Sequence, residues 1–110
     1  MPLKLSSLGI HLLKRIGEDQ QWPVGTTEQQ YVADLQHAVA HPDAQIWTYR
    51  YFGQPFIGFM APSHVQTVAK PEQYIFVAYS PQYCTLTTGY QVSSKDTVFT
   101  AGYSNVLQQR

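Results

Sequence analysis

Two parts of different character meet in the stretch HPDAQIWTYRYF, residues 41–52. Pro42 and Asp43 end a helical pattern that reaches His41, because proline lacks the backbone N–H and clashes with the preceding turn. The residues that follow, 46–52, are rich in aromatic and β-branched side chains, which favour a strand. The stretch therefore predicts the boundary between an N-terminal helical part and a C-terminal sheet.

Two helices are expected upstream of this boundary. Apolar residues recur at steps of three and four over residues 3–16, which is the period of a helix with one buried stripe. The segment Trp-Pro-Val-Gly at 22–25 interrupts helical structure. A threonine at 26 or 27 then offers an N-cap, with a glutamine three residues later as its capping-box partner. The second helical pattern runs from there to about His41.

Five strands are expected downstream. They are residues 46–52, 56–60, 74–79, 84–92 and 97–103, separated by turns and by a long loop over 61–73. The fold class is therefore α+β, with two N-terminal helices followed by a twisted antiparallel sheet of about five strands. At 110 residues the chain fits a single domain, 1–110.

The composition is that of a globular chain with little charge. Hydrophobic residues make up 44% and charged residues 13%, and seven basic residues balance seven acidic ones. This balance excludes a strong overall positive field, so any RNA site must be a local patch. The one cysteine, Cys84, excludes an internal disulfide and a cysteine-based metal cluster. No signal-peptide core and no long apolar run occur, so we expect a cytoplasmic chain that does not span a membrane.

Basic and titratable side chains gather on the expected first helix. His11, Lys14 and Arg15 stand at i, i+3 and i+4 and share one helix face, with Lys4 two turns earlier on the same side. An imidazole beside fixed positive charge suits phosphodiester cleavage, with Arg15 and Lys4 as substrate-binding candidates. The alternative is a solvated face with an ordinary scatter of basic residues.

Two strand segments carry further candidates. A period of two places Thr88 and Tyr90 on one side of their strand together with Leu86, where a hydroxyl and a ring can hold a phosphate and stack a base. Strand propensity alone also explains these residues. Arg50 lies between two tyrosines, as in many nucleic-acid surfaces, and is a substrate-binding candidate or a surface residue that covers the sheet.

The expected second helix carries a possible metal set. Asp34, His37 and His41 lie near one face, and two histidines one turn apart can bind zinc. No glutamate lies between the histidines in the metalloprotease pattern, and no third strong ligand is evident. We therefore favour a polar outer face and expect neither metal nor cofactor. Trp22 and His64 could edge a pocket, but no pattern assigns them a role.

The order of these elements resembles the catalytic domain of colicin D and its relatives among bacterial contact-dependent and RelE-like ribonuclease toxins. The matches are His11 on the first helix, Thr-Tyr-Arg at 48–50, and hydroxyl-Gly-aromatic at 88–90, so that the resemblance covers about residues 3–92. The family has tryptophan where this chain has Tyr90. The family's lysine just before the histidine has no counterpart here.

This resemblance implies a metal-independent endoribonuclease toxin. Such a domain cleaves tRNA by attack of a ribose 2′-hydroxyl, leaves a cyclic phosphate, and is neutralised by a cognate immunity or antitoxin protein. His11 would be the general acid and base, Thr88 would bind the phosphate, and Tyr90 would hold the substrate. Lys14 or Arg15 would replace the missing lysine.

The alternative is a non-catalytic binding module that docks a protein partner or homodimerises through its sheet. The two interpretations differ in geometry. The nuclease requires that the His11 edge of the first helix lie beside the strand bearing Thr88 and Tyr90.

Overall fold

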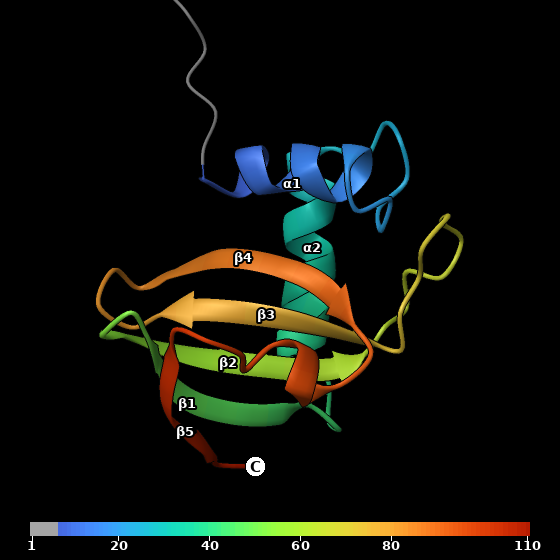
Figure 1. The fold of residues 1–110 in the computed structure, drawn as a ribbon. Helices are drawn as coiled ribbons and strands as arrows, with labels where there is room; N and C mark the ends of the chain where they lie inside the picture. Colours follow the sequence, from blue (N-terminus) through green and yellow to red (C-terminus); the bar gives the residue numbers. More distant parts are fainter. Residues whose placement is uncertain (1–6) are drawn as a thin grey trace, which may run out of the picture.

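The computed structural model describes residues 7–110, which form two helices followed by a five-stranded antiparallel sheet (Figure 1). The elements are α1 (Ser7–Gly17), α2 (Glu28–Val39), β1 (Gln45–Tyr51), β2 (Gln54–Pro62), β3 (Tyr74–Ser80), β4 (Thr85–Val92), the short 3₁₀ turn η1 (Lys95–Thr97) and β5 (Tyr103–Gln108). The predicted α+β class, with both helices ahead of the sheet, is confirmed. None of the described helices is long and apolar enough to cross a membrane.

The capping box at the start of α2 is present and begins at Thr27. The Thr27 hydroxyl accepts a bond from the Gln30 backbone N–H at 3.1 Å, and the Gln30 side chain accepts one from the Thr27 N–H at 2.9 Å. These reciprocal bonds satisfy two of the N–H groups that a helix start leaves without partners. At the other end, Ala40 closes the helix just before Pro42, as expected.

The sheet has the strand order β4-β3-β2-β1-β5. The β1–β2 hairpin pairs Tyr51 with Gln54, so its turn consists of Phe52 and Gly53. Both turn residues have positive φ values, 47° and 80°. Positive φ at both positions is what a two-residue hairpin needs to match the strand twist, and glycine adopts it without strain.

The prediction of a strand at 97–103 is wrong. The chain forms η1 and an irregular segment there, and the fifth strand is β5, which pairs with β1 at the opposite edge from β4. Val98 is only 2% exposed, and the Phe99 ring packs against Trp47. These apolar side chains fill the core from an irregular backbone, which is why their composition resembled that of a strand.

Two hydrophobic clusters lie on opposite faces of the sheet. Helix α2 lies behind the sheet in Figure 1, while η1 and the start of β5 lie in front of it, and α1 runs along the β4 edge. The cluster on the helix side contains Leu12, Trp22, Tyr31, Leu35, Ala38, Ala44, Ala61, Ile75 and Val77. The cluster on the other side contains Trp47, Tyr49, Met60, Phe76, Ala78, Val92 and Val98. The sheet is therefore buried on both faces.

Candidate functional site

A cleft of about 360 Å³ opens on the sheet face opposite α2, next to the β4 edge. We call it the aromatic cleft, because six of its lining side chains are aromatic rings. It is lined by His11, Arg15, Tyr49, Tyr51, Phe56, Phe76, Ala78, Thr87, Thr88, Tyr90 and Tyr103. Four of the sequence candidates, on α1 and β4, thus lie in one cleft. They are His11, Arg15, Thr88 and Tyr90.

Arg15 joins α1 to β4 at this cleft. Its Nε donates to the Gly89 carbonyl at 2.9 Å, and its Nη2 donates to the Thr88 hydroxyl at 3.0 Å. The guanidinium also lies over the Tyr90 ring, 5.0 Å from the centroid, in a cation–π arrangement. The residue is only 6% exposed. A buried, multiply bonded guanidinium fixes the helix relative to the strand.

Asp19 compensates the charge of this buried arginine. One turn further along the chain, its Oδ2 accepts a 2.8 Å bond from Nη1 of Arg15. Hydrogen bonds and a nearby opposite charge both offset the cost of burying a cation, and Asp19 supplies the opposite charge. The Asp19 side chain is 30% exposed and is not among the residues that line the cleft.

His11 is half-buried and lines the cleft. Burial lowers the pKa of its imidazole below 6.5, and the positive charges of Arg15 and Lys14 lower it further. The neutral form of the ring therefore predominates at neutral pH. A neutral imidazole can accept a proton, which is the property that a general base needs.

A β-bulge in β4 places two consecutive side chains, Thr87 and Thr88, in the lining of the cleft. Ala78 of β3 pairs with Thr88, but the next residue of β3 pairs with Leu86, so Thr87 is an extra residue without a partner in the ladder. Thr87 and Thr88 both line the cleft, and the Thr87 hydroxyl donates to the Ala78 carbonyl at 3.1 Å. Leu86 packs with the cluster on the helix side. The expectation that Leu86 and Thr88 share a face is wrong, because the extra residue reverses the alternation.

The peptide of Gly89 is held by a residue that the sequence did not indicate. The Tyr31 hydroxyl, from α2, donates to the Gly89 carbonyl and accepts from the Gly89 N–H at 3.0 Å. A Cβ at position 89 would lie 2.2 Å from Cδ2 of Leu35, so only glycine allows α2 to approach this strand. Tyr31 lies at a helical core spacing, and nothing in the sequence distinguishes it from an ordinary core residue.

The hydroxyl groups of Tyr49 and Tyr90 remain protonated at neutral pH. Burial raises the pKa of Tyr90, and the neighbouring Tyr103 raises it further. Burial likewise raises the pKa of Tyr49. These groups therefore present neutral donors together with flat ring faces, a combination suited to stacking and hydrogen bonding of a base.

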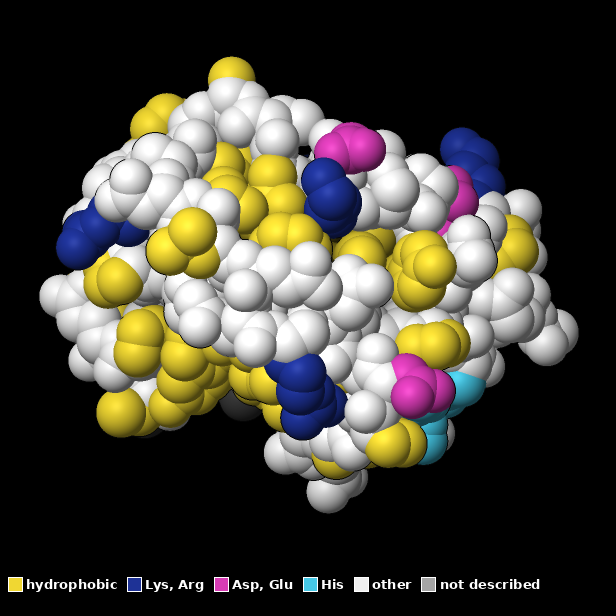
Figure 2. All heavy atoms as spheres, turned by 90° about the horizontal axis from the view of Figure 1, so that it is seen from below, with side chains coloured by type: hydrophobic (Ala, Val, Ile, Leu, Met, Phe, Trp, Pro, Cys, Tyr) yellow, Lys and Arg dark blue, Asp and Glu magenta, His cyan; other side chains and the backbone are white. Residues whose placement is uncertain are grey.

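Three basic candidates do not line the cleft. Lys14 is exposed, and its positive charge lowers the pKa of His11. Arg50 donates from Nη1 to the Gly53 carbonyl at 2.8 Å, and it points away because its neighbours on β1 face the cleft. Lys4 lies outside the described residues. On the face seen in Figure 2, the described Lys and Arg side chains lie apart from one another.

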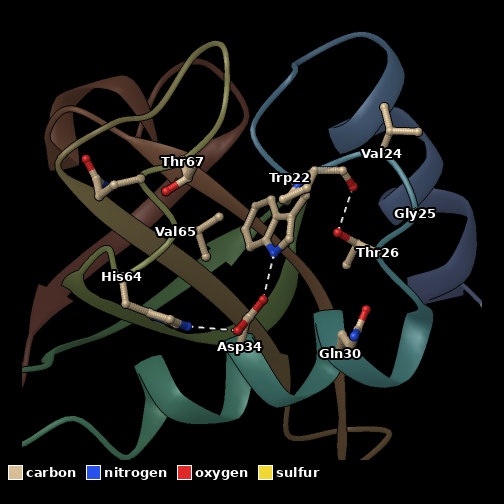
Figure 3. Close-up of a pocket in the computed structure, with 11 residues that line it drawn as sticks. Trp22, Val24, Gly25, Thr26, Gln30, Asp34, His64, Val65 and Thr67 are labelled. Carbon is tan, nitrogen blue, oxygen red and sulfur yellow. Dashed lines mark hydrogen bonds and ion pairs between the residues drawn. The ribbon is translucent and has the colours of Figure 1, made fainter.

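A second, wider pocket of about 550 Å³ lies between α2 and two loops (Figure 3). Asp34 stands between two partners there. Its Oδ1 is 2.8 Å from Nε2 of His64, and its Oδ2 accepts from Nε1 of Trp22 at 3.0 Å. The centroids of the His37 and His64 rings lie 4.4 Å apart. Within residues 7–110, no group of three or more His, Cys, Asp or Glu is placed to hold a metal ion.

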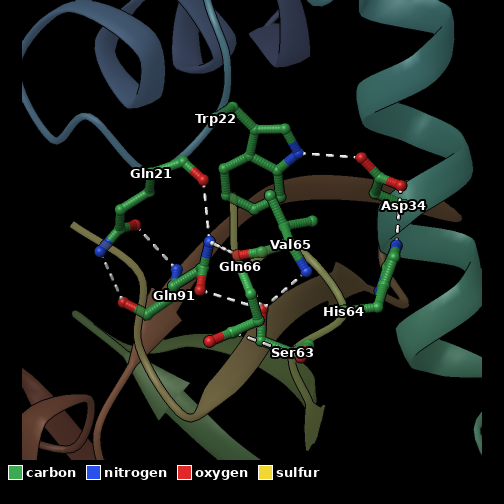
Figure 4. A network of polar contacts seen from close by, with 8 residues as sticks. All are labelled: Gln21, Trp22, Asp34, Ser63, His64, Val65, Gln66 and Gln91. Atoms are coloured by element: carbon green, nitrogen blue, oxygen red, sulfur yellow. Dashed lines mark hydrogen bonds and ion pairs between the residues drawn. The ribbon is translucent and has the colours of Figure 1, made fainter. Parts of the chain in front are cut away.

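Gln91 ties the loops of this region to β4 (Figure 4). It is 3% exposed, and its Nε2 donates to the carbonyls of Gln21 and Val65, both at 2.8 Å. Its Oε1 accepts from Ser63 and from the Glu72 N–H, both at 2.9 Å. This satisfied buried amide holds both loops beside the strand that carries the cleft residues.

Comparisons of the chain with protein-family models, with curated proteins and with solved structures find no match.

Proposed function

We propose that this domain is a metal-independent endoribonuclease whose active site is the aromatic cleft. The observation that carries the proposal is the meeting of a neutral imidazole, a buried guanidinium and a hydroxyl bonded to that guanidinium with six aromatic rings in one cleft. The proposed substrate is tRNA, which places the action in the cytoplasm, and the proposed regulator is a cognate immunity or antitoxin protein.

The chemistry follows from the roles that these groups can fill. His11 takes the proton from a ribose 2′-hydroxyl, and the resulting oxygen attacks the adjacent phosphorus. The bond from phosphorus to the 5′-oxygen breaks, a 2′,3′-cyclic phosphate forms, and the protonated His11 returns its proton to the leaving oxygen. Thr88 and Arg15 face the charge that develops on the phosphate.

The environment of His11 supports its role as the base. Burial and two cations keep the ring unprotonated at neutral pH, so the acceptor nitrogen is available before the substrate binds. Once protonated, the ring is a stronger acid than an ordinary histidine, which favours return of the proton. The lowered pKa of His11 thus assists both the removal of the 2′-hydroxyl proton and its return to the leaving oxygen.

The charges of the two pockets favour the aromatic cleft over the wider pocket. The wider pocket is lined by one carboxylate, Asp34, and by no lysine or arginine. A phosphodiester approaching it would meet a negative charge without a compensating fixed cation. The aromatic cleft offers Arg15 instead, together with ring faces on which a base can stack.

The test compares two histidines that line different pockets. Purified wild-type domain, His11→Ala and His64→Ala are incubated with tRNA in the presence of EDTA, and products are resolved on denaturing gels and tested for cyclic phosphate ends. We expect His11→Ala to lose about 100-fold or more of the cleavage rate, as for loss of a general base. His64→Ala should retain the wild-type rate, and both variants should melt as cooperatively as the wild type.

Two results would contradict the proposal. One is that wild-type protein leaves tRNA and total RNA intact. The other is that His11→Ala cleaves as fast as the wild type does.

A second function is favoured by the neutral charge balance. The seven cations equal the seven anions, and Asp19 already compensates the one buried cation of the cleft. A cleft with six rings and little net charge also fits an apolar or aromatic side chain of a protein partner. This binding module would form a complex that His11→Ala leaves intact, whereas Tyr90→Ala and Tyr51→Ala would weaken it.

A further inference from the structure

We propose that Asp19 determines how strongly the aromatic cleft binds anions, and that it acts through Arg15. This inference rests on the proposed function, because it assumes that the anion is the phosphate of the substrate. It goes further by assigning a role in selectivity to a carboxylate outside the cleft. The consequence is that removing a native charge should improve binding.

The arrangement of bonds around Arg15 leads to this inference. All three nitrogens of the guanidinium already donate to groups of the protein, namely Nε to Gly89, Nη2 to Thr88 and Nη1 to Asp19. Two of the acceptors are neutral and belong to β4. Asp19 is the one charged acceptor among them, and its bond at 2.8 Å is the shortest of the three.

A phosphate that approaches Arg15 therefore meets a cation whose charge is already compensated. The Asp19 carboxylate repels the incoming anion and competes with it for the guanidinium. In a half-buried site this repulsion is screened less than it would be on an open surface. An uncharged ligand that binds only to the aromatic rings is affected neither by this repulsion nor by the competition for the guanidinium.

Asp19 can change without collapse of the cleft. Its side chain is partly exposed, and the two bonds from Arg15 to β4 do not depend on it. Asp19→Asn keeps a carbonyl oxygen that can accept from Nη1 but removes the negative charge. Asp19→Ser is a second variant that removes the carboxylate altogether.

Glu18 provides the matched control. It is the neighbouring residue, it is exposed, and Glu18→Gln changes the net charge of the protein by the same amount. Any effect of net charge alone appears equally in both variants. Only an effect that passes through Arg15 separates them.

The experiment measures binding rather than cleavage. Adenosine 3′-monophosphate and uncharged adenosine are titrated into each protein at low salt, and the dissociation constants are read from the NMR shifts of the His11 ring and of the Thr88 amide. Thermal melts establish that each variant is folded. A double variant, Arg15→Gln with Asp19→Asn, tests whether the effect passes through Arg15.

We expect Asp19→Asn and Asp19→Ser to bind the nucleotide about tenfold more tightly than the wild type, the size expected for removal of one like charge in a partly buried site. Adenosine binding should change less than twofold, and Glu18→Gln should resemble the wild type. The gain in nucleotide affinity should shrink as salt is added. The double variant should show no gain over the wild type. Equal effects of Asp19→Asn and Glu18→Gln, an equal gain for adenosine, or no gain would each overturn the inference.

The outcome is separable from that of the proposed function. If tRNA is not cleaved but Asp19→Asn gains nucleotide affinity selectively, the nuclease proposal fails and the role of Asp19 stands. If tRNA is cleaved at His11 but Asp19→Asn behaves like Glu18→Gln, the nuclease proposal stands and the role of Asp19 is wrong.

Discussion

The Thr88 hydroxyl accepts a 3.0 Å hydrogen bond from Nη2 of Arg15, and this bond joins β4 to α1 across 73 residues of chain. The bond places the two halves of the candidate site, one on a helix and one on a strand, in a fixed relation. Its partner bond from Nε to the Gly89 carbonyl prevents rotation of the guanidinium about a single contact. The cleft is thus held in place by a residue that also lines it.

Replacement of Arg15 should destabilise the fold as well as alter the site. Arg15→Met keeps much of the packing volume but removes three hydrogen bonds and leaves Asp19 without its cation. We expect a loss of about 3 kcal/mol in the free energy of unfolding, measured by urea denaturation. Arg50→Met, at an exposed arginine with one bond to a turn carbonyl, should stay within about 0.5 kcal/mol of wild type. Equal losses in the two variants would show that Arg15 is not a structural link.

Position 89 should accept only glycine while Leu35 is present. In Gly89→Ala the new methyl group would lie 2.2 Å from the Leu35 side chain, so helix or strand must move. We expect a loss of about 1–3 kcal/mol, as for other overpacked sites. Leu35→Ala alone should cost about 2–5 kcal/mol, and the double variant should cost clearly less than the sum. Strict additivity in thermal or urea unfolding would contradict this contact.

Loss of the Gln91 side-chain amide should loosen the two loops that it ties to β4. Gln91→Leu has similar size, but it removes the amide donor from the part-buried carbonyls of Gln21 and Val65. We expect a loss of about 2–4 kcal/mol in the free energy of unfolding and faster amide exchange over residues 63–73. Gln29→Leu, at an exposed glutamine of α2, is the control and should change neither quantity. Unchanged exchange in Gln91→Leu would refute the role of the amide.

The pH dependence of the cleft should respond to Lys14. Its positive charge contributes to the lowered pKa of His11, so Lys14→Gln should raise that pKa toward 6.5. A base is active in its neutral form, so the pH below which cleavage declines should move upward in the variant. NMR titration of the His11 ring measures the same shift without any substrate. Lys70→Gln, in the loop after β2, should leave both the titration and the pH profile unchanged. A downward shift in Lys14→Gln would contradict the electrostatic explanation.

Local signals in the sequence were sufficient for the order and type of most elements. Pro42 ended the helical part, and Thr27 with Gln30 formed the capping box, because these features depend on backbone groups only a few residues away. The positions of His11 and Arg15 on one helix face followed from the helical period alone. The α+β class then followed from the order of these segments.

Tertiary structure decided the features that depend on residues distant in the chain. The bulge at Thr87 arises from pairing with β3, and β5 forms where β1 offers it an edge for pairing. Arg15 reads from the sequence as a surface cation, yet β4 and Asp19 satisfy it in a buried position. Sequence thus determined the elements through local hydrogen bonding and periodicity. Packing between elements determined which side chains meet, because burial of a charge or an extra strand residue is stable only where distant partners satisfy it.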